Sequence, residues 1–361
     1  MNERVQRLRT TLQKYELDGA LISSRQNRRY LSGFTGSAGY LLITPDDAVI
    51  ATDFRYFEQS ATQAPDFRLH KGVSGSFDSW VPGLFAGLGG KKFAFEASDM
   101  SVAVHHEFKK CIASLPADER PQLVPTPNLV ESLRIFKEPQ EIDALQRAVD
   151  LADAAFVDVA QRIEPGWTER QVAWEIEKYI REHGGDAISF DTIVAGGPWG
   201  AMPHAYPRDR KLEKGEAVVI DMGADVDGYM SDLTRTIFLG KPDDEFKKIY
   251  DIVLTAQLTA EEIVREGMTG DEGHMIAHNV IEAAGYGETF GHSLGHGVGL
   301  QVHEAPRLGR RSKDELKDGM VFTIEPGIYV TGWGGVRIED MVVMEGGRAR
   351  VMSTAPKLQF A

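Results

Sequence analysis

The spacing of apolar residues predicts alternating helices and strands in the first third of the chain. Val5, Leu8, Leu12 and Tyr15 recur at the period of a helix, which predicts an amphipathic helix over residues 3–16. Short runs rich in β-forming residues predict strands at residues 19–23, 40–44, 48–52 and 92–96, with further helices at 54–63 and 101–114. This alternation predicts a small α/β domain with helices packed on a mixed sheet.

Two segments rich in glycine or proline interrupt this pattern. Residues 27–39 lack the Gly-Lys-Ser/Thr ending of a phosphate-binding loop, so we interpret them as a turn-rich connection. Residues 116–127 hold four of the sixteen prolines, the clearest change of composition in the chain. We therefore expect one domain over residues 1–127 and a second over residues 128–361.

The second domain is expected to begin with a pair of helices. An apolar stripe through Ile142, Leu145 and Val149 predicts a long helix, and Thr168 is a typical cap for the next one. A strand over residues 189–195 leads into a loop rich in Gly and Pro that ends at His204. Further helices are expected at about 243–266 and 271–284, and helix pairs on either side of a hairpin suggest an internal duplication.

The hairpin between these helix pairs carries one aspartate inside each of its two apolar strands. If Asp227 and Gly228 form a two-residue turn, Asp221 faces Thr234, and Asp232 projects from the same face as Asp221. Two buried like charges must share a proton or bind a cation, and a divalent ion is the simplest solution.

Later segments add side chains of the same kind. Residues 290–304 place three histidines in a glycine-rich run, and two further apolar strands are each interrupted by a glutamate. Taken singly, each residue could be an ordinary surface carboxylate or core histidine. The combined set contains mostly oxygen ligands, which suits Mn²⁺ or Co²⁺, and Zn²⁺ less exclusively, and its charge balances two divalent ions better than one. The set is Asp221, Asp232, His296, Glu325 and Glu339.

These residues resemble the pita-bread metallopeptidase family, in its branch of Xaa-Pro aminopeptidases and Xaa-Pro dipeptidases (prolidases). The match extends to His204, His292 and His303, and to Arg337 two residues before the last glutamate. The resemblance implies an α/β (α+β) chain with a small creatinase-like N-terminal domain and a C-terminal pita-bread domain. It also implies two divalent metal ions per subunit, Mn²⁺ foremost, proline-containing peptides as substrates, and a homodimer.

The resemblance further implies a role for each residue in hydrolysis by a metal-activated water. Asp221 would bind one ion, Asp232 and Glu339 would bridge both, and His296 and Glu325 would complete the set. Glu325 would also move a proton. On the same basis His292 and His303 would hydrogen-bond the scissile carbonyl and the developing oxyanion, and His204 would line the site. Arg337 would orient a carboxylate ligand or pair with a substrate carboxylate.

The resemblance leaves the exact activity open. We predict an Xaa-Pro aminopeptidase, because residues 33–36 and 53–56 look most like small bacterial enzymes of that kind. The alternative, an Xaa-Pro dipeptidase, needs an extra arginine to capture the carboxylate that follows proline. The sequence does not place its four candidates, Arg208, Arg210, Arg307 and Arg310. A methionine aminopeptidase normally lacks the leading domain, and a catalytically silent pita-bread binding protein would not need the full ligand set.

Composition excludes several other classes of partner. The net charge of −14 disfavours nucleic acid or an anionic membrane as the main partner. A single cysteine, Cys111, allows no intrachain disulfide and fits a reducing compartment. The charged N-terminal segment does not resemble a signal peptide, and no apolar run approaches about 18 residues, so a cytoplasmic protein is expected.

Overall fold

The computed structural model describes residues 2–72 and 76–360, and it divides the chain into two compact units, residues 1–134 and 135–361. Each unit has its own buried apolar core, as a separately packed domain requires. The limits of 1–127 and 128–361 stay predictions from composition. Across the described residues, no helix combines the length and the apolar character that a membrane span needs.

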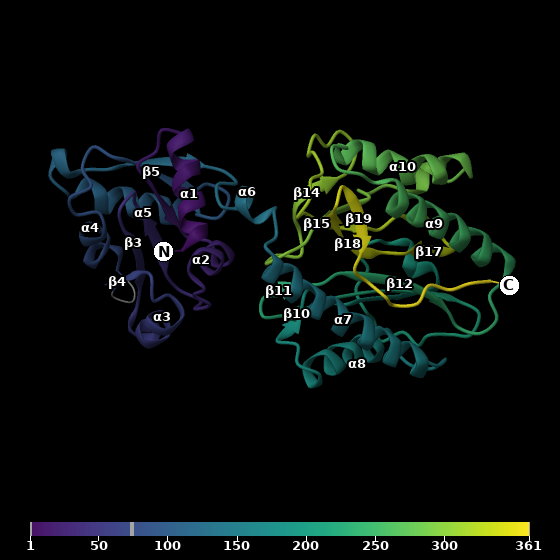
Figure 1. Cartoon of the computed structure of the whole chain (residues 1–361). Coiled ribbons are helices and arrows are strands. Elements are labelled where there is room, and N and C mark those ends of the chain that lie inside the picture. The colour runs from purple at the N-terminus through teal and green to yellow at the C-terminus, as the bar shows by residue number, and fades with distance from the viewer. Residues whose placement is uncertain (1, 73–75, 361) are drawn as a thin grey trace. The chain divides into compact units, whose positions relative to one another are not determined.

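The first unit is built on a mixed sheet of six strands, as the alternation of its elements predicts (Figure 1). The strand formed by Gly19–Ile22 (β1) pairs antiparallel with Tyr40–Ile43 (β2) and parallel with Lys92–Glu96 (β5). In spatial order the strands are β4 (Arg68–Lys71), β3 (Ala48–Thr52), β2 (Tyr40–Ile43), β1 (Gly19–Ile22), β5 (Lys92–Glu96) and β6 (Gln122–Thr126). The helices are α1 (Glu3–Lys14), α2 (Arg25–Ser32), α3 (Phe57–Gln63), α4 (Val81–Leu84), α5 (Val102–Ala113) and α6 (Glu131–Arg134).

Two segments of this unit differ from the interpretation of the sequence. The supposed turn-rich connection contains α2, which Ser24 caps and which ends at Gly33 in the left-handed region, φ 79°. The glycines therefore end a helix instead of excluding one. The proline-rich segment contains β6, which lies at the edge of the sheet, where a proline such as Pro125 is tolerated.

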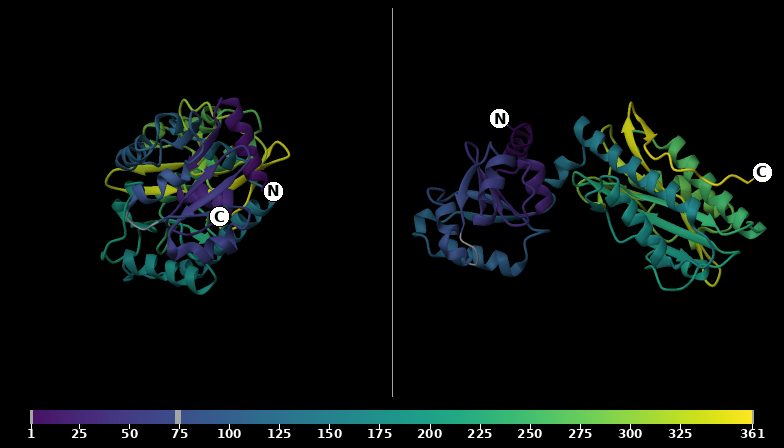
Figure 2. Two further views of the ribbon diagram at one scale, coloured as in Figure 1. Left: turned by 90° about the vertical axis from the view of Figure 1, so that its left-hand side faces the viewer. Right: turned by 90° about the horizontal axis from the view of Figure 1, so that it is seen from below.

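The second unit places strands between two pairs of helices (Figures 1 and 2). The first pair is α7 (Pro139–Arg162) and α8 (Glu169–Glu182), and the second is α9 (Asp244–Ile263) and α10 (Gly270–Ala283). Thr168 caps α8 as predicted, because its side chain accepts a hydrogen bond from the backbone of Gln171.

The strands of this unit form small sheets of up to five members. One contains β11 (Tyr229–Met230), β10 (Ala224–Val226) and β7 (Ala187–Ile188), and another contains β12 (Leu233–Phe238), β9 (Ala217–Met222) and β8 (Ile193–Gly196). The largest contains β14 (Glu304–Leu308), β13 (Gly295–Gly297), β15 (Val321–Ile324), β18 (Asp340–Glu345) and β19 (Arg348–Val351), and β16 (Gly327–Val330) pairs with β17 (Gly334–Arg337).

The hairpin register agrees with the prediction, whereas one predicted strand does not. Thr234 pairs with Asp221, and Asp227 and Gly228 both have positive φ, as a tight two-residue turn requires. The strand expected over residues 189–195 is wrong in its first half. Residues 189–192 form no strand; the Ser189 amide donates to the Gly223 carbonyl at 2.9 Å and its hydroxyl to the Ser231 carbonyl at 2.8 Å.

Candidate active site

The nine site residues named from the sequence line one cavity of about 370 Å³ in the second unit. The five metal-ligand candidates come from neighbouring strands. Asp221 lies on β9 and His296 on β13, Glu325 directly follows β15, and Asp232 and Glu339 directly precede β12 and β18. Since strands fix the direction of their side chains, the sheets aim these groups at one point.

Three of the candidates are close enough to share one cation. One donor atom from each of Asp232, His296 and Glu339 lies within 4.8 Å of the others. His296 Nε2 is 3.5 Å from Asp232 Oδ2 and 3.3 Å from Glu325 Oε1. These distances leave room for an ion between the groups without a large rearrangement.

The carboxylates are buried at a cost that a cation would remove. Asp232 and Glu339 are only 5% and 1% exposed. Burial, followed by repulsion from neighbouring carboxylates, raises the pKa of both groups well above the usual range. Burial also raises the pKa of Glu325 to about 8. A bound divalent ion reverses this preference, because it stabilises the ionised carboxylates.

Two buried oxygens point to the same conclusion. Asp221 Oδ1 and Glu339 Oε1 accept no hydrogen bond from any residue within 2–72 or 76–360. Buried carboxylate oxygens without a partner are costly, and metal coordination is one way to satisfy them. The residues present therefore fit divalent metal ions.

His296 is held in the form that a metal ligand needs. Burial lowers its pKa, so the ring is neutral at pH 7, and Nδ1 is 3.1 Å from the carbonyl oxygen of Gly297. A carbonyl can only accept, so Nδ1 carries the proton and Nε2 offers its lone pair toward Asp232 and Glu325. A lone pair facing carboxylates is unfavourable unless a cation lies between them.

Arg337 joins the ligand set to a chain of hydrogen bonds. Its Nη2 donates to Asp221 Oδ2 at 2.6 Å and its Nη1 to the Tyr329 hydroxyl at 2.7 Å. The Tyr329 hydroxyl is also 2.9 Å from His292 Nε2, and His292 Nδ1 is 2.8 Å from the Ser293 carbonyl. Arg337 thus orients a carboxylate, and both ring nitrogens of His292 are engaged. Sequence reasoning missed Tyr329, which reads as an ordinary apolar strand residue.

His204 and His303 lie at the open side of the cavity. Both are exposed, and the His303 ring centroid is 4.3 Å from that of His296. Partial burial of the ring, followed by the nearby His296, lowers the pKa of His303, so its imidazole is neutral at pH 7. A neutral exposed imidazole can donate to a substrate carbonyl.

Arg307, one of the four candidate arginines that the sequence did not place, lines the same cavity. Its Nε donates to Ser293 Oγ at 3.1 Å, but Nη1 and Nη2 make no hydrogen bond or ion pair with any residue that the structure describes. The other three candidate arginines are occupied: Arg208 pairs with Glu169, Arg210 with Glu216, and Arg310 contacts His278.

A cavity lined by closely spaced carboxylates and histidines, set between paired helices, is typical of a metal-dependent hydrolase. Residues 143–345 match Metallopeptidase family M24, and residues 4–136 match the Creatinase/Prolidase N-terminal domain. The chain therefore belongs to metallopeptidase family M24 and has the pita-bread fold of that family. It is a metallo-exopeptidase, which argues against a catalytically silent binding protein.

Full-length relatives refine this assignment. The chain is 40% identical to a structure described as an Xaa-Pro dipeptidase from Bacillus anthracis, with a TM-score of 0.93 and coverage of 99% and 98% of the two chains. It is 36% identical to an Xaa-Pro dipeptidase of Pyrococcus horikoshii over 99% of both chains. A structure of an X-Pro aminopeptidase from Thermotoga maritima is 34% identical, with a TM-score of 0.89 over 98% of both chains. These similarities favour the dipeptidase alternative over our aminopeptidase prediction.

Proposed function

We propose that this protein is an Xaa-Pro dipeptidase that hydrolyses the bond between a first residue and a terminal proline. Asp221, Asp232, His296, Glu325 and Glu339 would hold two divalent ions, Mn²⁺ foremost, with Co²⁺ and Zn²⁺ as alternatives. When bound, such ions polarise the scissile carbonyl and lower the pKa of water. Homodimerisation and a cytoplasmic location stay predictions from the sequence.

The position of Arg307 in the catalytic cavity is the observation that supports this proposal most directly. A dipeptidase must bind the carboxylate that directly follows proline, and a guanidinium group is well suited to this task because it can donate two parallel hydrogen bonds. Arg307 lines the catalytic cavity, and its two terminal nitrogens have no partner among the described residues. Ser293 holds its Nε, which fixes the direction of the side chain.

The other residues divide the remaining tasks. Arg337 is buried and already bound to Asp221 and Tyr329, so it orients a metal ligand and does not bind the substrate carboxylate. Glu325 lies at the edge of the ligand set, 3.3 Å from His296 Nε2, and would also move a proton to the leaving nitrogen of proline. His303 would donate to the scissile carbonyl, while His292 would reach an oxyanion only after leaving Tyr329.

The apolar part of the cavity suits the substrate's side chains. Phe190, Ile193, Pro203 and Val302 line it beside the charged groups. The volume of about 370 Å³ lies at the lower end of the range typical of small-molecule pockets, about 300–1,000 Å³. A small apolar pocket with a few fixed charges is suited to a dipeptide.

One observation favours an Xaa-Pro aminopeptidase as the second candidate. His292, Ser293 and Arg307 also line a neighbouring polar cavity of about 750 Å³. Residues beyond proline in a longer peptide could lie in that cavity if Arg307 moved aside.

A matched set of substrates tests the proposal. The purified protein is stripped of metal, supplied with Mn²⁺, Co²⁺ or Zn²⁺, and given an Xaa-Pro dipeptide, the same dipeptide as its amide, and an Xaa-Pro-Yaa tripeptide. We expect metal-dependent cleavage that is fastest for the free dipeptide, about 10- to 30-fold less efficient for its amide, and absent for the tripeptide. Equal cleavage of all three would favour the aminopeptidase, and no cleavage with any metal would overturn both.

A further inference from the structure

Two charged side chains are buried beside the metal-ligand cavity without lining it. Arg235 and Asp340 are each 1% exposed, and Arg235 Nη2 lies 2.6 Å from Asp340 Oδ1. Removing an ion pair from water is costly, and a protein with apolar residues of similar volume in place of the pair is often equally stable. The pair therefore matters more for the orientation that it imposes on neighbouring groups than for the stability of the fold.

This ion pair holds the backbone of a metal-ligand candidate. Asp340 directly follows Glu339, and Arg235 Nη1 donates to the Glu339 carbonyl at 2.5 Å and to the Thr234 carbonyl at 3.0 Å. The Glu339 amide donates to the Thr234 carbonyl at 3.1 Å. The Thr234 hydroxyl donates to Glu339 Oε2 at 2.6 Å. Both peptide groups of Glu339 are thus fixed, and with them the direction of its carboxylate.

The C-terminal segment completes this arrangement. Residues 352–360 form no helix or strand, and they run beside α9 in Figure 1 and in the right-hand view of Figure 2. The Ala355 carbonyl accepts from Arg235 Nη2 at 2.8 Å. Lys357 Nζ lies 2.6 Å from Asp340 Oδ2, the oxygen that Arg235 does not bind.

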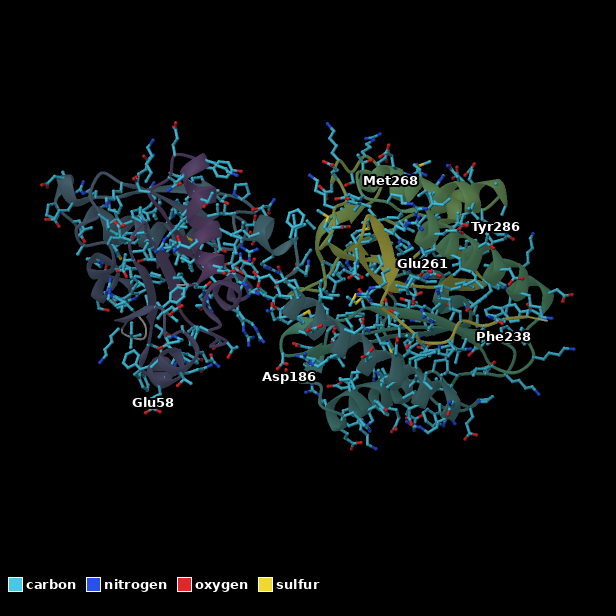
Figure 3. All side chains as sticks on the ribbon, viewed as in Figure 1. Glu58, Asp186, Phe238, Glu261, Met268 and Tyr286 are labelled. Atoms are coloured by element: carbon cyan, nitrogen blue, oxygen red, sulfur yellow. The ribbon has the colours of Figure 1, made fainter. Side chains whose placement is uncertain are left out.

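Helix α9 holds Lys357 in this position. Lys357 Nζ donates to Gln257 Oε1 at 2.8 Å, and Gln257 Nε2 donates to Asp340 Oδ2 at 2.8 Å. Glu261, labelled in Figure 3, lies one turn further along the helix, 3.4 Å from the ammonium group. The ammonium group therefore has a fixed direction, and the side chain of Lys357 is only 20% exposed.

We propose that the C-terminal segment is a positioning element of the metal centre. Ala355 and Lys357 hold the Arg235–Asp340 pair, and this pair holds Glu339 so that its carboxylate points at the metal position. The inference rests on the proposed role of Glu339 as a metal ligand, but not on the identity of the peptide substrate. Partners beyond the ligands themselves commonly change metal affinity by about 10- to 100-fold when they are lost.

The test is the Mn²⁺ affinity of Lys357→Met, measured by competition with a fluorescent chelator well below the unfolding temperature. Methionine keeps an unbranched stem and removes the charge. We expect the dissociation constant to rise roughly tenfold. Lys357→Arg, which restores a cation for Asp340, is expected to recover most of the affinity.

The sign of the change separates positioning from simple electrostatics. Losing a positive charge by itself favours cation binding, so an unchanged or tighter Mn²⁺ affinity in Lys357→Met would overturn the proposal. Lys248→Met, which removes a charge elsewhere on α9, is the matched control and should not weaken binding. A lower melting temperature without weaker binding would show a purely structural role and would also overturn it.

Two features keep the test decisive. Lys357→Gln removes the charge but keeps a hydrogen-bond donor, and it replaces the methionine variant if that variant does not fold. Since the readout is metal binding without substrate, a failure to hydrolyse peptides would refute the proposed function and leave this test unaffected.

Discussion

Replacing Arg307 with glutamine tests the recognition of the substrate carboxylate. Glutamine keeps a polar side chain of moderate length and removes the charge and the forked donors. A hydrogen bond to a charged group contributes about 1.5–3 kcal/mol. Arg307 is exposed, so solvent screening favours the lower part of this range, about 1.5–2 kcal/mol. This corresponds to a loss of about 10- to 30-fold in kcat/KM for an Xaa-Pro dipeptide.

The assay compares the free dipeptide with its amide in both proteins. The wild type should cleave the amide about 10- to 30-fold less efficiently than the free dipeptide, since the amide lacks the charge that Arg307 binds. Arg307→Gln should cleave the two substrates with similar kcat/KM, near the wild-type value for the amide.

The nearby Arg310 provides the matched control. It is also exposed, but it contacts His278 and does not line the catalytic cavity. Arg310→Gln should keep the wild-type ratio between dipeptide and amide. An equal loss on both substrates in Arg307→Gln would refute the reasoning, because it would show a general effect on the pocket instead of a contact with the carboxylate.

Three further changes test other parts of the structure. Tyr329→Phe should lower kcat more than it raises KM and cost about 1–3 kcal/mol in unfolding free energy, because it removes a half-buried hydrogen-bond partner of His292. Kinetics and chemical denaturation measure the two effects, and unchanged values would contradict the hydrogen-bonded chain. Burial raises the pKa of Glu261 to about 8, above the value for an unfolded chain. The protonated carboxyl therefore stabilises the folded state, and this stabilisation is lost as pH rises through 8. Melting temperatures from pH 6 to 9 should therefore fall in the wild type and less steeply in Glu261→Gln; parallel curves would exclude this group. Gly295→Ala should lower stability by about 1–3 kcal/mol and reduce metal content, because the added carbon would lie 1.9 Å from a carbonyl oxygen of the neighbouring strand. Gly291→Ala, which has open space around the added carbon, is the control, and equal melting temperatures for the two variants would contradict the clash.

Local pattern was sufficient to predict several elements and one register. The amphipathic stripes predict α1 and α7, and Thr168 marks the start of α8, because these signals depend on residues within one or two turns. The turn residues Asp227 and Gly228 fix the pairing of Asp221 with Thr234. The glycines near α2 misled the interpretation, since a glycine that ends a helix cannot be told from one in a loop by composition alone.

The tertiary structure decided which charged groups meet. Nothing near Arg307 in the sequence shows that this residue lines the cavity while Arg208, Arg210 and Arg310 are occupied. The same is true of Tyr329, whose hydroxyl meets Arg337 from a neighbouring strand.

The sequence by itself therefore determined the α/β character of the first unit, the hairpin and the types of side chain available for metal chemistry. Those properties follow from period, turn chemistry and ligand type, which act over a few residues. The structure decided the pairing of Lys357 with Asp340, the orientation of Glu339 and the position of Arg307 at the catalytic cavity. Such properties depend on contacts between segments distant in the sequence, and their energies are set by burial, which only the folded chain defines.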